Sequence, residues 1–205
     1  AEEAGEMVEL YWMAKLRDTH FSYLATGTAN ADALAAAVAM SALSDFRGPK
    51  VAGAVTPQTL FRDNAAGANV GPYLSQFLLR PVPFGAVNID QRMRTLVAGD
   101  EHMKDFASWL AIQNGAKPTV TATYDNTRRY IRNGRDLSEW VHIDVLYQAY
   151  FHAALIMLTP PDAGDTVTGG GLGVPMNPGN LYLDSQTQCG FGTFGPPYVM
   201  TLLTE

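Results

Sequence analysis

The strongest constraint on the fold of this chain is a periodic pattern between residues 127 and 158. Trp140, Asp144, Tyr147 and Phe151 recur at spacings of four, three and four residues, which places side chains on one face of an α-helix. Gly134 can break the segment into two helices. We therefore expect two helices here, one of them central and heavily buried.

Five other segments carry helical signals, such as capping residues, a proline in the first turn or apolar residues at helical spacing. They span residues 3–17, 30–42, 71–79, 100–113 and 196–205. The second of them opens with Asn30 or Asp32 as its cap. The first has an apolar face that needs a packing partner, formed by Met7, Leu10, Tyr11 and Leu16.

The segment at residues 100–113 combines three helical signals. Asp100 is a capping residue and Gly115 ends the pattern. Between them runs an apolar stripe formed by Met103, Phe106, Trp109 and Leu110. This combination predicts a helix that begins at the aspartate.

Glycine and proline mark two stretches as loops. Residues 46–69 favour loop with short helical pieces, and the chain after Pro160 is rich in glycine and proline through Gly179. Neither an internal repeat nor a linker between independent domains is evident. The residues alone therefore predict one mainly helical domain or part-domain over positions 1–205.

Composition narrows the class of protein. The chain has 205 residues and a net charge of -6, which argues against a nucleic-acid-binding surface. Cys189 is the sole cysteine, so an internal disulfide is excluded and the compartment stays undecided. The apolar runs are too short for a membrane span. The chain starts at Ala1 with no basic, apolar leader, so we expect a removed leader or an internal piece.

Four arginines form the most basic cluster, at positions Arg128, Arg129, Arg132 and Arg135. Three of them, 128, 132 and 135, would share one helical face, where an oxyanion such as phosphate or vanadate could bind. The favoured alternative is an exposed face on which the arginines pair with Asp136 or Glu139.

Other candidate sites are weaker. His142 and Asp144 point to nearly opposite sides of a helix, so a satisfied helix histidine is the better interpretation. The remaining histidines lack zinc-ligand spacing, and the serines and the cysteine lack a nucleophile setting. The glycines at 169–173 lack the flanking residues of a nucleotide-binding loop.

Asp184, Gln186 and Gln188 carry oxygen atoms at alternate positions. In an extended loop these side chains would point the same way and could ligate a hard cation such as calcium. Only one is charged, so simple loop hydrogen bonding is the favoured alternative.

Several segments, in order, resemble the vanadium-dependent haloperoxidases, particularly the bromoperoxidases of red algae and their bacterial relatives. The matching residues run through most of the chain, at 9–14, 60–62, 70–76, 89–92, 132–142, Asp144, Tyr147, 149–150 and 194–205. The resemblance implies an all-α helical bundle with long Gly/Pro-rich loops. It implies oxidation of halide, bromide above all, by hydrogen peroxide at a bound vanadate.

The resemblance also implies that the chain is the amino-terminal, scaffold half of such an enzyme. In the family, the residues that hold vanadate follow the helix that matches 196–205, so no residue here is assigned as a vanadate ligand and the chain alone is expected to be inactive. A companion polypeptide would carry them, in a homo- or hetero-oligomer. Secretion or a periplasmic location would fit the family.

One part of the resemblance concerns a metal. The segment from Asn180 to Gln188 resembles the loop in which algal members hold a structural calcium. Gln188 fits that loop, whereas Gln186 stands where an acidic ligand is expected, and Asp184 could compensate.

Two other functions stay open. Helices that lack their partners would leave large apolar faces, as in a non-catalytic assembly or interaction module. An acid-phosphatase-like relative is the second alternative, because phosphatase and vanadate sites share geometry in this superfamily.

Overall fold

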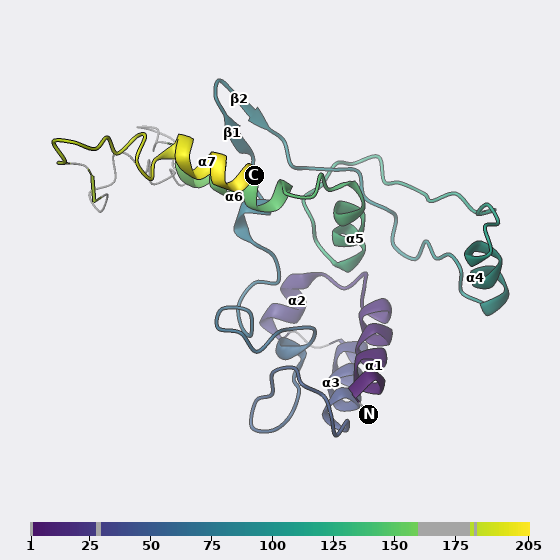
Figure 1. The fold of residues 1–205 in the computed structure, drawn as a ribbon. Coiled ribbons are helices and arrows are strands. Elements are labelled where there is room, and N and C mark those ends of the chain that lie inside the picture. Colours follow the sequence, from purple (N-terminus) through teal and green to yellow (C-terminus); the bar gives the residue numbers. More distant parts are fainter. Residues whose placement is uncertain (1, 28–29, 160–180, 183) are drawn as a thin grey trace. The chain divides into compact units, whose positions relative to one another are not determined.

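The computed structural model describes residues 2–27, 30–159, 181–182 and 184–205 (Figure 1). The chain forms two compact units, each built from two separate stretches of sequence. Unit 1 comprises residues 1–73 and 93–142, and unit 2 comprises residues 74–92 and 143–205. The Gly/Pro-rich stretch at residues 160–180, with the glycines at 169–173, lies outside the described residues.

Unit 1 is helical. Its elements are α1 (Glu2–Lys15), α2 (Phe21–Thr26), α3 (Ala31–Ser41), the short 3₁₀ helix η1 (Pro57–Thr59), α4 (Phe106–Gln113) and α5 (Gly134–Ile143), which ends at the boundary with unit 2. The predicted helix at 30–42 is confirmed as α3, and Asn30 is its cap, since its side-chain Oδ1 accepts a hydrogen bond from Ala33 N at 2.6 Å.

The core of unit 1 forms around the small residues of α3. Ala33, Ala36, Ala37 and Met40 are buried at helical spacing, and α3 packs against α1. Leucines from the α1–α2 region and from the loop after η1 complete the cluster with Phe46 and Val55. Because alanines are short, the neighbouring backbones can approach α3 closely.

α1 confirms the predicted helix but not its predicted packing face. Met7, Leu10 and Tyr11 are exposed, at 66%, 57% and 57%. Leu16, the fourth residue of the predicted face, is buried in the core just after the helix ends, and Trp12 packs against the same core. The apolar spacing was ambiguous because two faces of this helix carry large apolar side chains.

The helix predicted at 100–113 begins later, as α4 at Phe106. Asp105 is its cap and accepts a hydrogen bond from Ser108 N at 2.8 Å. Asp100, the predicted cap, instead accepts one from Thr123 N at 2.6 Å. The positive φ of 50° at Met103 lies outside helical geometry, so the predicted stripe spans a loop and a helix.

The periodic segment at 127–158 does contain two helices, α5 and α6 (Gln148–Leu158). Gly134 is the first residue of α5 rather than the break between them, and Asn133 accepts a hydrogen bond from Asp136 N at 3.0 Å there. The break falls at residues 144–147, where Leu146 has a φ of 72°. α5 buries only Arg135 and Asp136, and α6 buries only His152, Ala154 and Ile156. The heavily buried central helix that the sequence predicted is therefore not found.

Unit 2 combines α6 and α7 (Pro196–Thr204) with a small sheet. Strands β1 (Val82–Phe84) and β2 (Val87–Ile89) form an antiparallel hairpin with Val82 opposite Ile89, and α6 contacts β1, α7 and the 3₁₀ helix η2 (Gln76–Leu78). Gly85, with a φ of 60°, permits the two-residue turn. The fold is mostly helical, and the all-α expectation missed this hairpin.

Two further expectations meet the structure in unit 2. The helix predicted at 196–205 is confirmed as α7, with Pro196 in its first turn. The helix predicted at 71–79 is wrong, because only the single turn of η2 forms there and Gly71 has a φ of 92°. Among the described residues no single helix is long and apolar enough to cross a membrane. α5 and α6 reach the necessary length and apolar composition only when they are counted together.

Candidate functional site

The arginines predicted to bind an oxyanion lie around the start of α5 in unit 1. Arg132 pairs with Asp136, a fully buried carboxylate, through its Nε at 2.8 Å and its Nη2 at 3.3 Å. The backbone N–H of Arg132 donates to the same carboxylate at 3.1 Å. The hydrogen bond between the two side chains is the main reason that the pKa of Arg132 lies above its ordinary value.

Arg135 is held still more closely. Its Nε and Nη2 donate to the two oxygens of Asp18 at 2.5 and 2.9 Å, a two-pronged pair that joins α5 to the turn after α1. Its Nη1 donates to the carbonyl oxygen of Asp100 at 2.5 Å. The hydrogen bond from Arg135 is the main reason that the pKa of Asp18 lies below its ordinary value.

The cluster therefore does not form the predicted oxyanion site. Arg129 pairs with Asp125 at 2.7 Å and, by its hydrogen bond, lowers the pKa of that carboxyl to about 2. Arg128 is exposed, and positions 128 and 132 precede α5, so the shared helical face does not exist. The predicted pairing with Asp136 is found, but the face is not exposed as expected, because Asp136 and Arg135 are both buried. Glu139 accepts a hydrogen bond from Tyr124 Oη instead.

This pairing decides how well the described residues fit vanadate. An oxyanion needs several positive donors that converge and are not already neutralised. Three of the four arginines meet carboxylates within their own unit. The arginine cluster therefore does not fit vanadate.

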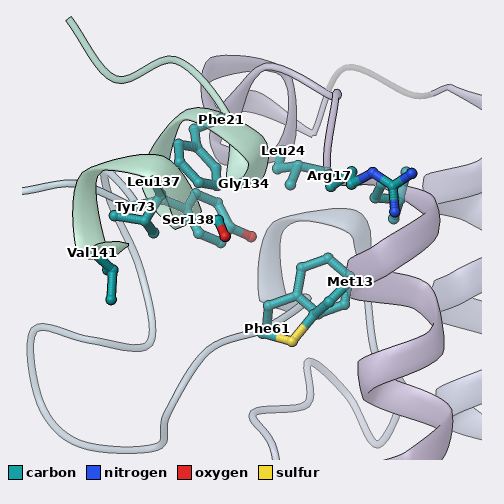
Figure 2. A pocket seen from close by; sticks show the side chains of 11 residues that line it. Met13, Arg17, Phe21, Leu24, Phe61, Tyr73, Gly134, Leu137, Ser138 and Val141 are labelled. Carbon is teal, nitrogen blue, oxygen red and sulfur yellow. The ribbon is translucent and has the colours of Figure 1, made fainter. Parts of the chain in front are cut away.

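A cavity of about 460 Å³ lies in unit 1, bordered by α1, α2 and α5 (Figure 2). Leu16 and Leu24, both buried, belong to the core beneath it. Aromatic rings of Phe21, Phe61 and Tyr73 line it, and α5 contributes Leu137, Ser138 and Val141. The walls are mainly apolar, so the cavity suits an apolar group rather than an anion.

Tyr73 is fixed at the cavity edge by three contacts. Its hydroxyl donates to the carbonyl oxygen of Leu60 at 2.8 Å, and its ring stacks on Phe21 with centroids 5.5 Å apart. The guanidinium of Arg62 lies 3.9 Å from the ring centroid. Burial raises the pKa of Tyr73. The phenol is thus neutral and serves to shape the cavity wall.

Unit 2 contains a buried histidine that the sequence analysis did not single out. His152 of α6 places Nδ1 3.0 Å from Gln91 Oε1. Gln91 Nε2 in turn donates to the carbonyl oxygens of Phe77 and Arg80, each at 2.6 Å. Burial lowers the pKa of His152, and nearby Asp144 opposes that shift. The ring is therefore neutral near pH 7 and connects α6 to the loop around η2.

No local motif could have revealed this network, because His152 and Gln91 are 61 positions apart. The histidines considered in the sequence take other roles. His142 lies in the last turn of α5, so it is a helix histidine as expected, and its side chain is exposed. His20 caps α2 by accepting a hydrogen bond from Ser22 N at 3.1 Å.

Asp184, Gln186 and Gln188 are exposed in the segment before α7. The segment turns rather than running extended, because Ser185 Oγ accepts hydrogen bonds from the N–H groups of Thr187 and Gln188. Gln188 Oε1 also accepts a hydrogen bond from Thr193 Oγ1 at 2.8 Å. Asn180 lies outside the described residues. The calcium set therefore stays a prediction, with one of its oxygens already engaged.

Sequence comparisons find relatives that are named vanadium-dependent bromoperoxidases. Vanadium-dependent bromoperoxidases of Corallina pilulifera and Corallina officinalis are each 30% identical to it over 247 positions, covering all of this chain and 39% of theirs. The vanadium-dependent bromoperoxidase of Ascophyllum nodosum is 29% identical over 205 positions, covering 98% of this chain and 35% of its own length. No protein-family model matches the chain.

A solved structure agrees with these relatives. It is the homohexameric structure of the second vanadate-dependent bromoperoxidase of Ascophyllum nodosum, which matches with a TM-score of 0.69 and 34% identity. The match covers 77% of this chain and 27% of that one. The chain thus spans little more than a third of the length of the curated relatives. The chain is therefore similar to a portion of the vanadium-dependent bromoperoxidases, as the sequence resemblance predicted.

Proposed function

We propose that the chain is the scaffold part of a vanadium-dependent haloperoxidase that oxidises halide, bromide above all, with hydrogen peroxide. The names of its relatives support the chemistry. The scaffold role rests on one observation above all: three of the four arginines in the cluster that could attract vanadate are already paired with carboxylates. The residues that hold vanadate are then supplied by a segment or chain that follows Glu205 in the family order.

Asp144 supports the need for such a companion. Among the residues that the structure describes, its Oδ1 atom is buried and has no hydrogen-bond partner. Leaving a buried acceptor unsatisfied costs about 1–3 kcal/mol, and more when the group is charged. A donor from a companion segment would remove that cost. In this proposal the helices described here form one side of a helical bundle that the companion completes.

The proposal includes assembly with further copies of the chain, because the related Ascophyllum enzyme has a homohexameric structure. The exposed apolar side chains of α1 and α4 agree with that proposal.

Peroxide-dependent bromination of an organic acceptor, with and without added vanadate, tests the enzymatic proposal. The 205-residue chain alone should give no turnover, and a sample that also contains the companion segment should gain vanadate-dependent turnover. Intact-mass analysis of the protein from its natural source tests separately whether a companion polypeptide exists. A lone 22.2 kDa polypeptide with no companion would contradict the proposal, as would phosphatase turnover that exceeds bromination.

The calcium proposal, built on Asp184, Gln186 and Gln188, has a separate test. Calcium added to the metal-free protein should raise the unfolding temperature, and Asp184→Asn should abolish that rise. Asp63→Asn, at another exposed aspartate in a loop, is the matched control. A calcium response that survives in the Asp184 variant would remove this residue from the site.

A further inference from the structure

Asparagine is followed directly by glycine at two places in the chain, Asn114–Gly115 and Asn133–Gly134. Glycine has no Cβ, so its backbone nitrogen meets little steric hindrance when it approaches the side-chain amide of the preceding residue. That approach is the first step of deamidation, a reaction that makes asparagine a thermolabile residue. The two pairs are chemically alike, so their surroundings decide which of them reacts.

The side chain of Asn133 is held in place at the start of α5. Its Oδ1 accepts a hydrogen bond from Asp136 N at 3.0 Å, and its Nδ2 donates to the carbonyl oxygen of Asp18 at 3.3 Å. The residue is only 9% exposed. Both ends of the amide are thus engaged, and turning it toward the nitrogen of Gly134 would break two hydrogen bonds in a buried place.

The surroundings of Asn114 are the opposite. It follows the last residue of α4 and is exposed, as is nearly all of the chain from residue 101 to residue 121. Figure 1 shows α4 between two long extended segments. Among the residues that the structure describes, none forms a hydrogen bond with the Asn114 side chain. The amide is therefore free to turn toward the next residue.

One hydrogen bond opposes the reaction at this pair. Gly115 N donates to the carbonyl oxygen of Ile112 at 2.9 Å, in a turn where the φ of Gly115 is 89°. This bond belongs to the end of an eight-residue helix that buries none of its residues and so lacks tertiary packing. The ends of such helices open locally at little cost in free energy. The nitrogen of Gly115 is thus released often, whereas Asn133 is released only when the start of α5 opens.

We propose that Asn114 is a site of spontaneous deamidation and that Asn133 is protected from it by the fold. The nitrogen of Gly115 attacks Cγ of Asn114, and a new C–N bond forms. The side-chain nitrogen takes up the proton from the attacking N–H group and leaves as ammonia. Water then opens the cyclic imide at either of its carbonyl carbons, which gives aspartate or isoaspartate. The reaction takes place within one chain and needs no cofactor and no partner.

The modification changes the end of α4. Aspartate and isoaspartate both place a new negative charge at the carboxyl end of the helix, where the helix dipole is itself negative. Isoaspartate also adds one carbon to the backbone, which shifts Gly115 N relative to the carbonyl oxygen of Ile112. Both changes weaken the last turn, so deamidation should loosen α4 and the loop that follows it.

The test is incubation of the folded 205-residue chain in mildly alkaline buffer, followed by proteolytic digestion and peptide mass spectrometry. Deamidation at Asn114 should be at least tenfold faster than at Asn133, because two hydrogen bonds must break first at the second site. In concentrated urea the two rates should become similar, which separates the effect of the fold from that of the sequence. Asn114→Gln, whose longer side chain cyclises poorly, is the control and should remove only the first signal.

Hydrogen exchange gives a second readout. Asn114→Asp, which reproduces one product, should speed amide exchange in α4 and leave that in α3 unchanged. Equal rates at the two asparagines in the folded chain, or an Asn114 that stays intact while the chain in urea reacts, would overturn the proposal. Unchanged exchange in α4 would overturn the expected loosening. None of these outcomes depends on bromination, so the proposed function is tested separately.

Discussion

Replacing Asp136 by asparagine should destabilise unit 1 more than any other single change to a charged residue described above. The carboxylate is 0% exposed and accepts three hydrogen bonds from Arg132. An amide at this position presents an N–H₂ group to a guanidinium that can only donate. Removing one partner of a buried ion pair costs about 3–5 kcal/mol, and the 37% exposure of the arginine side chain points to the lower end, about 3 kcal/mol.

Urea unfolding followed by tryptophan fluorescence measures the effect. With a slope of about 2 kcal/mol per molar urea, a loss of about 3 kcal/mol lowers the midpoint by roughly 1.5 M. Glu101→Gln is the matched control, because it breaks an exposed pair with Arg17 and should cost about 1 kcal/mol or less. The joint change Arg132→Met with Asp136→Leu should recover most of the loss, since apolar residues can replace a buried pair. A midpoint for Asp136→Asn equal to that of the control would refute the reasoning.

Three further predictions concern other parts of the chain. Because the pKa of His152 is lower in the folded protein, the unfolded chain takes up a proton at this ring at a higher pH than the folded chain does. The contribution of His152 to stability is therefore complete above pH 6.5 and declines below it. In urea titrations, His152→Gln should reduce the change in the free energy of unfolding between pH 7.5 and 5.5. Gly27→Ala should lower the free energy of unfolding by about 1–2 kcal/mol in thermal unfolding, because φ is 69° and a Cβ would lie 2.8 Å from the Gln58 side chain. Gly67→Ala is the control: a Cβ there meets open space, so the loss in free energy of unfolding should be smaller. Backbone N–H groups lower the pKa of Cys189, so its alkylation rate should reach half-maximum at a lower pH than that of an unstructured cysteine peptide measured in parallel, and an equal or higher midpoint would contradict the geometry.

Local chemistry made some of the helices predictable. Asn30 caps α3, and the alanines that follow have a high helix propensity. Pro196 defines the start of α7. The start of α4 was less predictable, because Asp100 and Asp105 are both good caps. The choice between them depends on the hydrogen bond from Thr123 to Asp100, which joins positions far apart in sequence.

The chemical role of the arginines depended on contacts that sequence spacing does not reveal. Asp136 lies four residues from Arg132 and was within reach of local reasoning. Asp18 lies 117 residues from Arg135, so no local pattern could assign that pair. The cavity beside α5 was equally hidden, since residues from α1, α2 and two loops meet there. Family resemblance, by contrast, relied on segments in order and identified the relatives correctly.

The pair between Asp18 and Arg135 also bears on how the chain emerges during synthesis. Unit 1 begins with the first residues, but α5 and its arginine are made 117 positions after Asp18. At roughly 5–20 residues per second, the first helices wait on the order of 6–25 s before the segment that completes their unit leaves the ribosome. During that interval the helices around Leu16 and Leu24 keep their cavity side uncovered, so chaperones can meet this apolar surface well before α5 covers it.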